Sequence, residues 1–206
     1  TPRNDPRCST RGQGKPVMQI LPPETKIALR RRAAPASEAG LARADAAVFV
    51  IADANPAAAI ARLPHARLWQ SLHRSVKRVA KTPLLVTRLP NARQTLAAVG
   101  FLRPGASSFE RLELAGKLMS EVVKPGVIAL QCHAVAFDAG ESALVVEALA
   151  SAALAAAAPM PQRKTRPTPP SDLRAIDAHG GRAADLERAV AIAAGNHLAR
   201  WLTTLP

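Results

Sequence analysis

Ala46-Ala47-Val48-Phe49-Val50-Ile51 is the stretch that decides the fold, because every one of its side chains is apolar. A continuous apolar run of strand length is typical of a strand that is buried on both faces, as in parallel sheets covered by helices on either side. The turn-forming segment Asp53–Pro56 follows it. The run therefore predicts the central strand of an α/β fold.

Outward from this run, strand and helix patterns alternate, with one adjacent pair of strands in the middle of the chain. The alternation predicts a three-layer helix–sheet–helix sandwich with a mixed, mainly parallel sheet. Residues 24–32 show no decisive pattern. The other expected strands are Val17–Leu21, Pro83–Leu89, Thr95–Phe101, Val127–Leu130 and Leu173–Asp177, and the expected helices are Ser37–Ala44, His65–Lys81, a helix from Ser107 or Ser108 to about Val123, Glu141–Ala158 and Ala183–Leu202.

Composition narrows the class of protein. The 206 residues are 48% apolar but only 3% aromatic, so the core must consist mostly of Ala, Val, Leu and Ile. Two cysteines, Cys8 and Cys132, are no disulfide framework and favour the cytoplasm. The longest apolar run, Ala143–Ala158, is interrupted by Glu147 and Ser151, so we expect no membrane span. Residues 1–16 are polar and predict a disordered leader without a secretory signal.

The net charge of +13 raises the possibility of an acidic partner or nucleic acid. No Asp or Glu occurs from Ala54 to Phe109, and the helix expected at His65–Lys81 carries a basic face. If this face binds nucleic acid, its contacts are Arg74, Lys77, Arg78 and Lys81. The alternative interpretation, which we favour, is a solvated basic face.

The sequence contains few residue spacings that are typical of a catalytic or ligand-binding site. No two histidines flank a glutamate at helical spacing, and no cysteine pair has the spacing of zinc ligands, so we predict neither a metal site nor a catalytic residue in this chain. Ser107 and Ser108 fit helix caps better than nucleophiles. His179-Gly180-Gly181 fits either a turn that needs positive φ, which we favour, or an anion-binding loop.

The run from Ala194 to Pro206, AGNHLARWLTTLP, resembles the segment that closes the amino-terminal domain in the leucine aminopeptidase (cytosol aminopeptidase) family of metallopeptidases. A weaker match covers Ala92–Val123, and in order the resemblance extends over about residues 17 to 206. The matching residues in the closing segment are Gly195, Leu198, Ala199, Arg200, Leu202 and Pro206, and the departures are His197, Trp201 and Thr204.

The resemblance implies a parent enzyme that removes amino-terminal residues from peptides. Family members are homohexamers with a macro-like amino-terminal domain and a catalytic domain that binds two divalent metals, commonly zinc, manganese or magnesium. We therefore expect a leader at 1–16, a macro-like domain at 17–182 and an inter-domain helix at 183–206 that leads to a catalytic domain. The family's metal ligands and catalytic residues fall beyond Pro206, so we expect this chain alone to be inactive.

Two other functions stay open. Some bacterial members of the family also bind DNA, so the chain is alternatively a DNA-binding module that uses its basic face. It is also a candidate nucleotide-binding domain of macro type, for which His179-Gly180-Gly181 is the one candidate phosphate loop.

Overall fold

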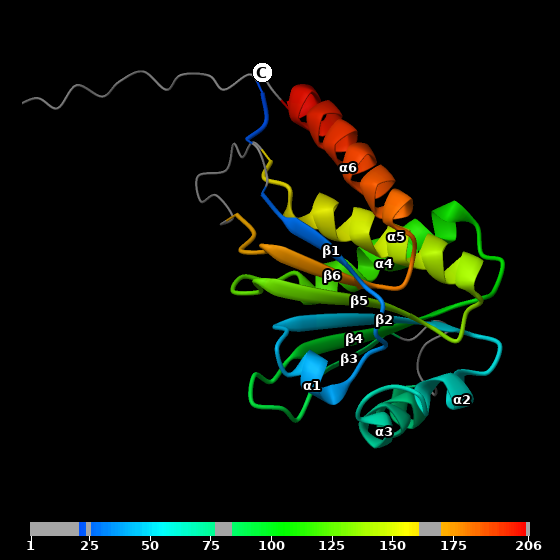
Figure 1. Cartoon of the computed structure of the whole chain (residues 1–206). Helices are drawn as coiled ribbons and strands as arrows, with labels where there is room; N and C mark the ends of the chain where they lie inside the picture. The colour runs from blue at the N-terminus through cyan, green and yellow to red at the C-terminus, as the bar shows by residue number, and fades with distance from the viewer. Residues whose placement is uncertain (1–20, 24–25, 77–83, 161–169, 205–206) are drawn as a thin grey trace, which may run out of the picture.

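A computed structural model shows one six-stranded sheet between two layers of helices (Figure 1). The structure describes residues 21–23, 26–76, 84–160 and 170–204. The strands are β1 (Ala28–Arg32), β2 (Ala46–Ala52), β3 (Leu85–Arg88), β4 (Leu96–Leu102), β5 (Ala129–Val135) and β6 (Ala175–His179). The helices are α1 (Glu38–Leu41), α2 (Pro56–Ile60), α3 (Ala66–Val76), α4 (Ser108–Val122), α5 (Ala139–Ala157) and α6 (Ala183–Thr204).

The order of the strands across the sheet is β1-β6-β5-β2-β4-β3. All neighbouring strands are parallel except β3, which runs antiparallel to β4. Val48 of β2 pairs with Ala98 of β4 on one side and Cys132 of β5 on the other. All seven residues of β2 are buried. The predicted fold class, its central strand and its mixed, mainly parallel sheet are therefore confirmed.

Alternate residues of β2 belong to two separate cores, one on each face of the sheet. Val48 and Val50 pack in the core that includes Leu118 of α4 and Leu149 of α5. On the other face, Phe49 and Ile51 pack in a core with Trp69 of α3. A strand whose side chains alternate between two hydrophobic layers has no polar face, which is why its sequence reads as an unbroken apolar run.

Helix α5 is the described helix that is long and apolar enough, by length and composition alone, to cross a membrane. Here it is a core helix: Val146, Leu149 and Ala150 are fully buried, and α5 packs between α4 and α6 against the sheet. A buried helix covered on several sides is apolar around most of its circumference for the same physical reason as a membrane helix.

Several elements differ from the sequence predictions. β1 lies in the stretch with no decisive pattern, because its three arginines keep it polar at the sheet edge. The expected turn at Asp53–Pro56 is present at residues 53–55, and it leads into the unpredicted helix α2, where the Asn55 side chain caps the helix and Pro56 takes its first position. β5 continues to Val135, five residues beyond the expected end at Leu130. Most of the strand expected at 17–21 and the Pro-rich segment at 161–169 lie outside the described residues, as does the leader.

α6 is only partly packed against the rest of the chain. Leu186 and Trp201 of α6 are buried, but Val190 is 46% exposed. The Nε2 atom of His197 lies 2.7 Å from the carbonyl oxygen of Pro159, which ties the middle of α6 to the end of α5.

Candidate functional site

The carboxyl ends of parallel strands are where open α/β sheets usually bind ligands. His179-Gly180-Gly181 lies at this edge, with His179 as the last residue of β6. Both glycines have positive φ, +100° and +71°. The Gly180 amide donates to the Arg32 carbonyl over 3.1 Å, and Arg31 Nε donates to the Gly181 carbonyl over 3.0 Å. The turn interpretation is confirmed. The Gly180 amide, which would be needed to bind an anion, instead joins the loop to the end of β1.

Acidic side chains at the same edge hold helix ends and loops in place. Glu110 completes a capping box with Ser107, as the sequence predicts for the start of α4, and also binds Arg103. Hydrogen bonds from Ser107 and Arg103 lower the pKa of Glu110 to about 2. Asp138 caps α5, and the Glu141 carboxylate accepts the Gly105 amide. Among the described residues, no group of three His, Cys, Asp or Glu side chains is arranged to hold a metal ion.

Two histidines of neighbouring strands stack on one face of the sheet: the buried His133 of β5 and the half-buried His179 of β6. The His133 ring lies 4.8 Å from Phe49 and 4.0 Å from His179, measured between ring centroids. Burial, and secondarily the neighbouring His179, lower the pKa of His133 well below its usual value, so the ring is neutral at pH 7. His133 Nε2 lies 3.2 Å from Gln131 Oε1, which accepts a hydrogen bond from the ring when Nε2 carries the proton.

Cys132 and His133 point to opposite faces of β5, as predicted for adjacent strand residues. Cys132 lies in the core beneath α4 and α5, where burial, aided by the charge of Asp177, raises its pKa to about 12. A thiol with this pKa is a poor nucleophile and a poor metal ligand at neutral pH. The described part of the chain therefore offers no reactive Cys–His pair at this position.

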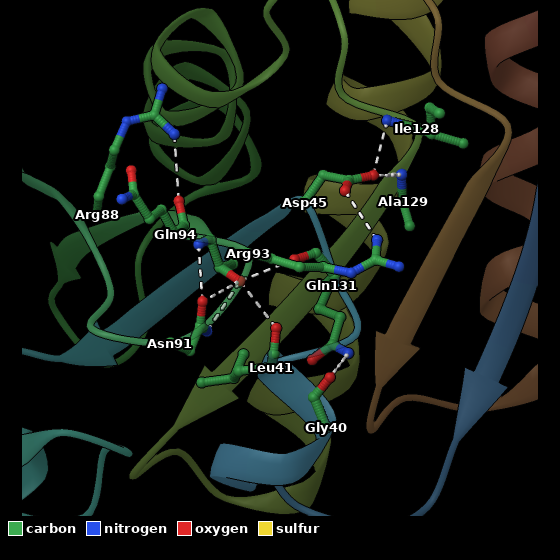
Figure 2. Close-up of polar contacts among 12 residues, drawn as sticks. Gly40, Leu41, Asp45, Arg88, Asn91, Arg93, Gln94, Ile128, Ala129 and Gln131 are labelled. Carbon is green, nitrogen blue, oxygen red and sulfur yellow. Dashed lines mark hydrogen bonds and ion pairs between the residues drawn. The ribbon is translucent and has the colours of Figure 1, made fainter.

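A polar network lies at the opposite edge of the sheet, where the parallel strands begin, and the sequence did not predict it. Figure 2 shows Asp45 accepting hydrogen bonds from the amides of Ile128 and Ala129 at 3.1 and 2.9 Å, and from Arg93 at 3.1 Å. The Gln131 side chain donates to the Gly40 carbonyl over 3.1 Å. Asp45 thereby joins the start of β2 to the start of β5. We assign the network a structural role, because its groups are satisfied by backbone and ion pairs at the amino ends of the strands.

Thr95 is the fully buried member of the same region. Its hydroxyl lies 2.9 Å from the Leu41 carbonyl and 2.8 Å from the Ala44 carbonyl, and its amide donates to Asn91 Oδ1. The only signal in the sequence is a turn-forming Asn four residues before Thr95, which does not reveal partners about fifty residues away.

The basic surface predicted around α3 is described only in part. Arg74 lies in the last turn of α3, with its Nε 3.3 Å from the Gln70 carbonyl, whereas Lys77, Arg78 and Lys81 lie outside the described residues. Trp69 is fully buried and donates to the Pro64 carbonyl, so it is not available for stacking on bases. The amphipathic character of the helix is confirmed, and nucleic-acid contact by these four residues stays a prediction.

The acid-free stretch from Ala54 to Phe109 is partly neutralised in the fold. Arg93 pairs with Asp45 from before the stretch, and Arg103 pairs with Glu110 from just after it. Within the described part of the chain, no acidic side chain lies within ion-pair distance of the other arginines of the stretch, which are Arg62, Arg67, Arg74 and Arg88. The surface therefore keeps a surplus of positive charge.

Comparison with known proteins finds no matching family model and no matching curated protein. Solved structures do match. A mutant of tomato leucine aminopeptidase superposes with a TM-score of 0.64 at 15% identity, covering 90% of this chain and 40% of that one. An M17 aminopeptidase from Trypanosoma brucei gives 0.51 at 18% identity, covering 89% and 38%, and the bottromycin maturation enzyme BotP, in complex with Mn, gives 0.51 at 16%, covering 79% and 32%.

The chain thus spans at most about two fifths of the length of these enzymes. That coverage is consistent with a match to their amino-terminal domain. The sequence of residues 194–206 resembles the segment that closes this domain in the leucine aminopeptidase family. At these identities the likeness establishes the fold, and the fold of this chain is one found within leucine aminopeptidases.

Proposed function

We propose that this chain is the amino-terminal domain of a leucyl-aminopeptidase-type enzyme. The single observation that carries the proposal is the superposition on tomato leucine aminopeptidase, which takes in 90% of this chain but only 40% of that enzyme. The match between residues 194–206 and the closing segment of the family's amino-terminal domain supports it independently. In this proposal residues 17–182 form the domain and 183–206 the connection to a catalytic domain.

The parent enzyme would hydrolyse amino-terminal residues from peptides as a cytoplasmic homo-oligomer, a hexamer by family resemblance. Two divalent metals, manganese or zinc, would supply the activated water that attacks the peptide bond. None of the described residues is assigned to hold those metals. The role of this chain would be to fold, contribute to assembly and shape access to the catalytic domain.

The proposal predicts that this chain alone does not hydrolyse Leu-p-nitroanilide in the presence of excess manganese. Tomato leucine aminopeptidase, assayed in parallel, provides the positive control. Turnover by this chain that exceeds the buffer blank and survives repurification would contradict the assignment.

A second candidate function is DNA binding, favoured by the surplus of exposed arginine on and around α3. Binding through phosphates requires clustered Arg and Lys and shows a steep loss of affinity with salt. We expect neutralisation of Arg74, Lys77, Arg78 and Lys81 to weaken binding to duplex DNA and to reduce the salt slope. The control is Arg200→Gln, at the end of α6. Absence of binding at low salt eliminates this function.

Nucleotide binding of macro type stays a third, weaker prediction. The Gly180 amide is already bonded to Arg32, which leaves the proposed phosphate loop without that donor. Calorimetry with ADP-ribose is expected to show no heat of binding.

A further inference from the structure

A groove runs along the outer surface of the helical layer formed by α4, α5 and α6. Its volume is about 620 Å³, and each of the three helices contributes residues at helical spacing to its lining. Leu112 of α4, Leu144 of α5 and Ile192 of α6 line it with 50%, 40% and 46% of their surface exposed. Three large aliphatic side chains exposed together mark a surface suited to binding an apolar partner.

The acidic and the basic side chains that line the groove differ in how they are paired. Glu147 is its acidic lining residue, and both of its carboxylate oxygens are bound by Arg188. Among the described residues, the acceptors that Arg111 reaches are neutral: the Ala106 carbonyl and the Ser108 hydroxyl. For Arg200, no acidic side chain of the described residues lies within ion-pair distance.

Arg111 and Arg200 lie at opposite ends of the groove. β4 and β6 run in the same direction in the sheet, and each leads into a helix, β4 into α4 and β6 into α6. Both helices therefore begin at the carboxyl edge of the sheet and run back towards its amino edge. Arg111 is in the first turn of α4, whereas Arg200 lies near the end of α6, just before its last turn. Between them the floor of the groove follows α5 from Leu144 to Ala156, which corresponds to about 18 Å of helix.

We propose that this groove binds an amphipathic helix whose apolar stripe carries a carboxylate at each end, about three helical turns apart. Residues spaced by eleven positions lie on the same side of a helix and about 16 Å apart, which matches the groove. The apolar stripe would contact Leu112, Leu144 and Ile192, and the two carboxylates would pair with Arg111 and Arg200. A second copy of the chain is a poorer occupant, because its net charge of +13 opposes association.

The experiment measures binding of a fluorescein-labelled helical peptide by anisotropy at low salt. The peptide carries leucines along one face and a glutamate at each end of that face, eleven positions apart. A matched peptide has glutamine in place of both glutamates. We expect Arg111→Gln and Arg200→Gln each to weaken binding of the acidic peptide about three- to fivefold, and Ile192→Asp to weaken it at least tenfold. The control variant is Arg67→Gln on α3, which removes the same charge outside the groove.

Four results would overturn the proposal. They are equal affinity for the two peptides, an equal effect of Arg67→Gln and Arg111→Gln, no binding of either peptide, and self-association of the chain in sedimentation that Ile192→Asp abolishes. Circular dichroism checks that each variant keeps its fold; the substituted side chains are exposed or half-buried. The aminopeptidase proposal does not depend on this outcome.

Discussion

At the scale of single residues, the most informative side chains are those whose partners are distant in the chain. Asp45 binds amides 83 and 84 residues away, and Thr95 binds carbonyls more than fifty residues away. The cap of α4 at Ser107 was predictable because its partner is three residues away. Sequence patterns report local geometry, so the long-range polar contacts had to come from the fold.

Removing Asp45 is expected to destabilise the protein far more than removing its ion-pair partner. Asp45→Ala leaves two backbone amides at the start of β5 without their acceptor and should lower the free energy of unfolding by about 2 kcal/mol. Arg93→Ala breaks an ion pair whose arginine is 55% exposed and should cost under about 1 kcal/mol. Urea denaturation of both variants measures the difference. Equal losses would show that the amides of Ile128 and Ala129 do not depend on Asp45.

The buried His133 is expected to make stability pH-dependent. Its pKa in the folded state is below the usual value of about 6.5, so the unfolded chain binds more protons as the pH falls below 6.5. Stability is therefore lost on acidification, by up to about 1.4 kcal/mol per pH unit from this group. Glu110 and Asp185, whose pKa values are also lowered, contribute only below about pH 4.5.

Chemical denaturation between pH 7 and pH 5 tests this effect in wild type and His133→Phe, which keeps an aromatic ring against Phe49. The variant should show a shallower fall in stability over this range. An unchanged slope would mean that His133 is not the responsible group.

At the scale of elements, the buried helices and strands were the predictable ones. The apolar run of β2 and the capped start of α4 carry strong patterns, whereas edge strand β1 does not, because its arginines face solvent and Asp177. Val190 of α6 is a different case, because it is apolar and yet 46% exposed. An amphipathic pattern predicts that one side of a helix is buried, but it does not identify the element that covers that side.

Two glycines should respond in opposite ways to substitution by alanine. A Cβ on Gly100 of β4 would lie 2.9 and 3.0 Å from the Leu114 and Leu118 methyls of α4, so Gly100→Ala should cost about 1–2 kcal/mol. Gly116 is exposed within α4 with nothing within 4 Å of the added atom, so Gly116→Ala should stabilise by about 0.5–1 kcal/mol. Thermal unfolding compares them. Stabilisation by Gly100→Ala would show that a Cβ atom fits between β4 and α4.

At the scale of the whole molecule, the fold class followed from β2, and the suspected family followed from the last thirteen residues. The superpositions on tomato leucine aminopeptidase, the M17 aminopeptidase and BotP agree with the fold class, and their coverage, 79–90% of this chain and 32–40% of those enzymes, is consistent with the suspected family. No candidate catalytic site could be predicted from the sequence, because the chain lacks spaced ligands or a nucleophile with its base. In the described part, the fold engages Asp45, Glu110 and Asp138 in caps and ion pairs, and His133 and His179 in a stack.

The most direct measurement is the rate of Leu-p-nitroanilide hydrolysis by the product of the complete gene, compared with this chain, each with manganese and after chelation. We predict turnover by the complete product that chelation abolishes and that manganese restores, with none from this chain. No turnover by the folded, manganese-loaded complete product, or turnover by this chain alone, would contradict its assignment as the amino-terminal domain of an aminopeptidase.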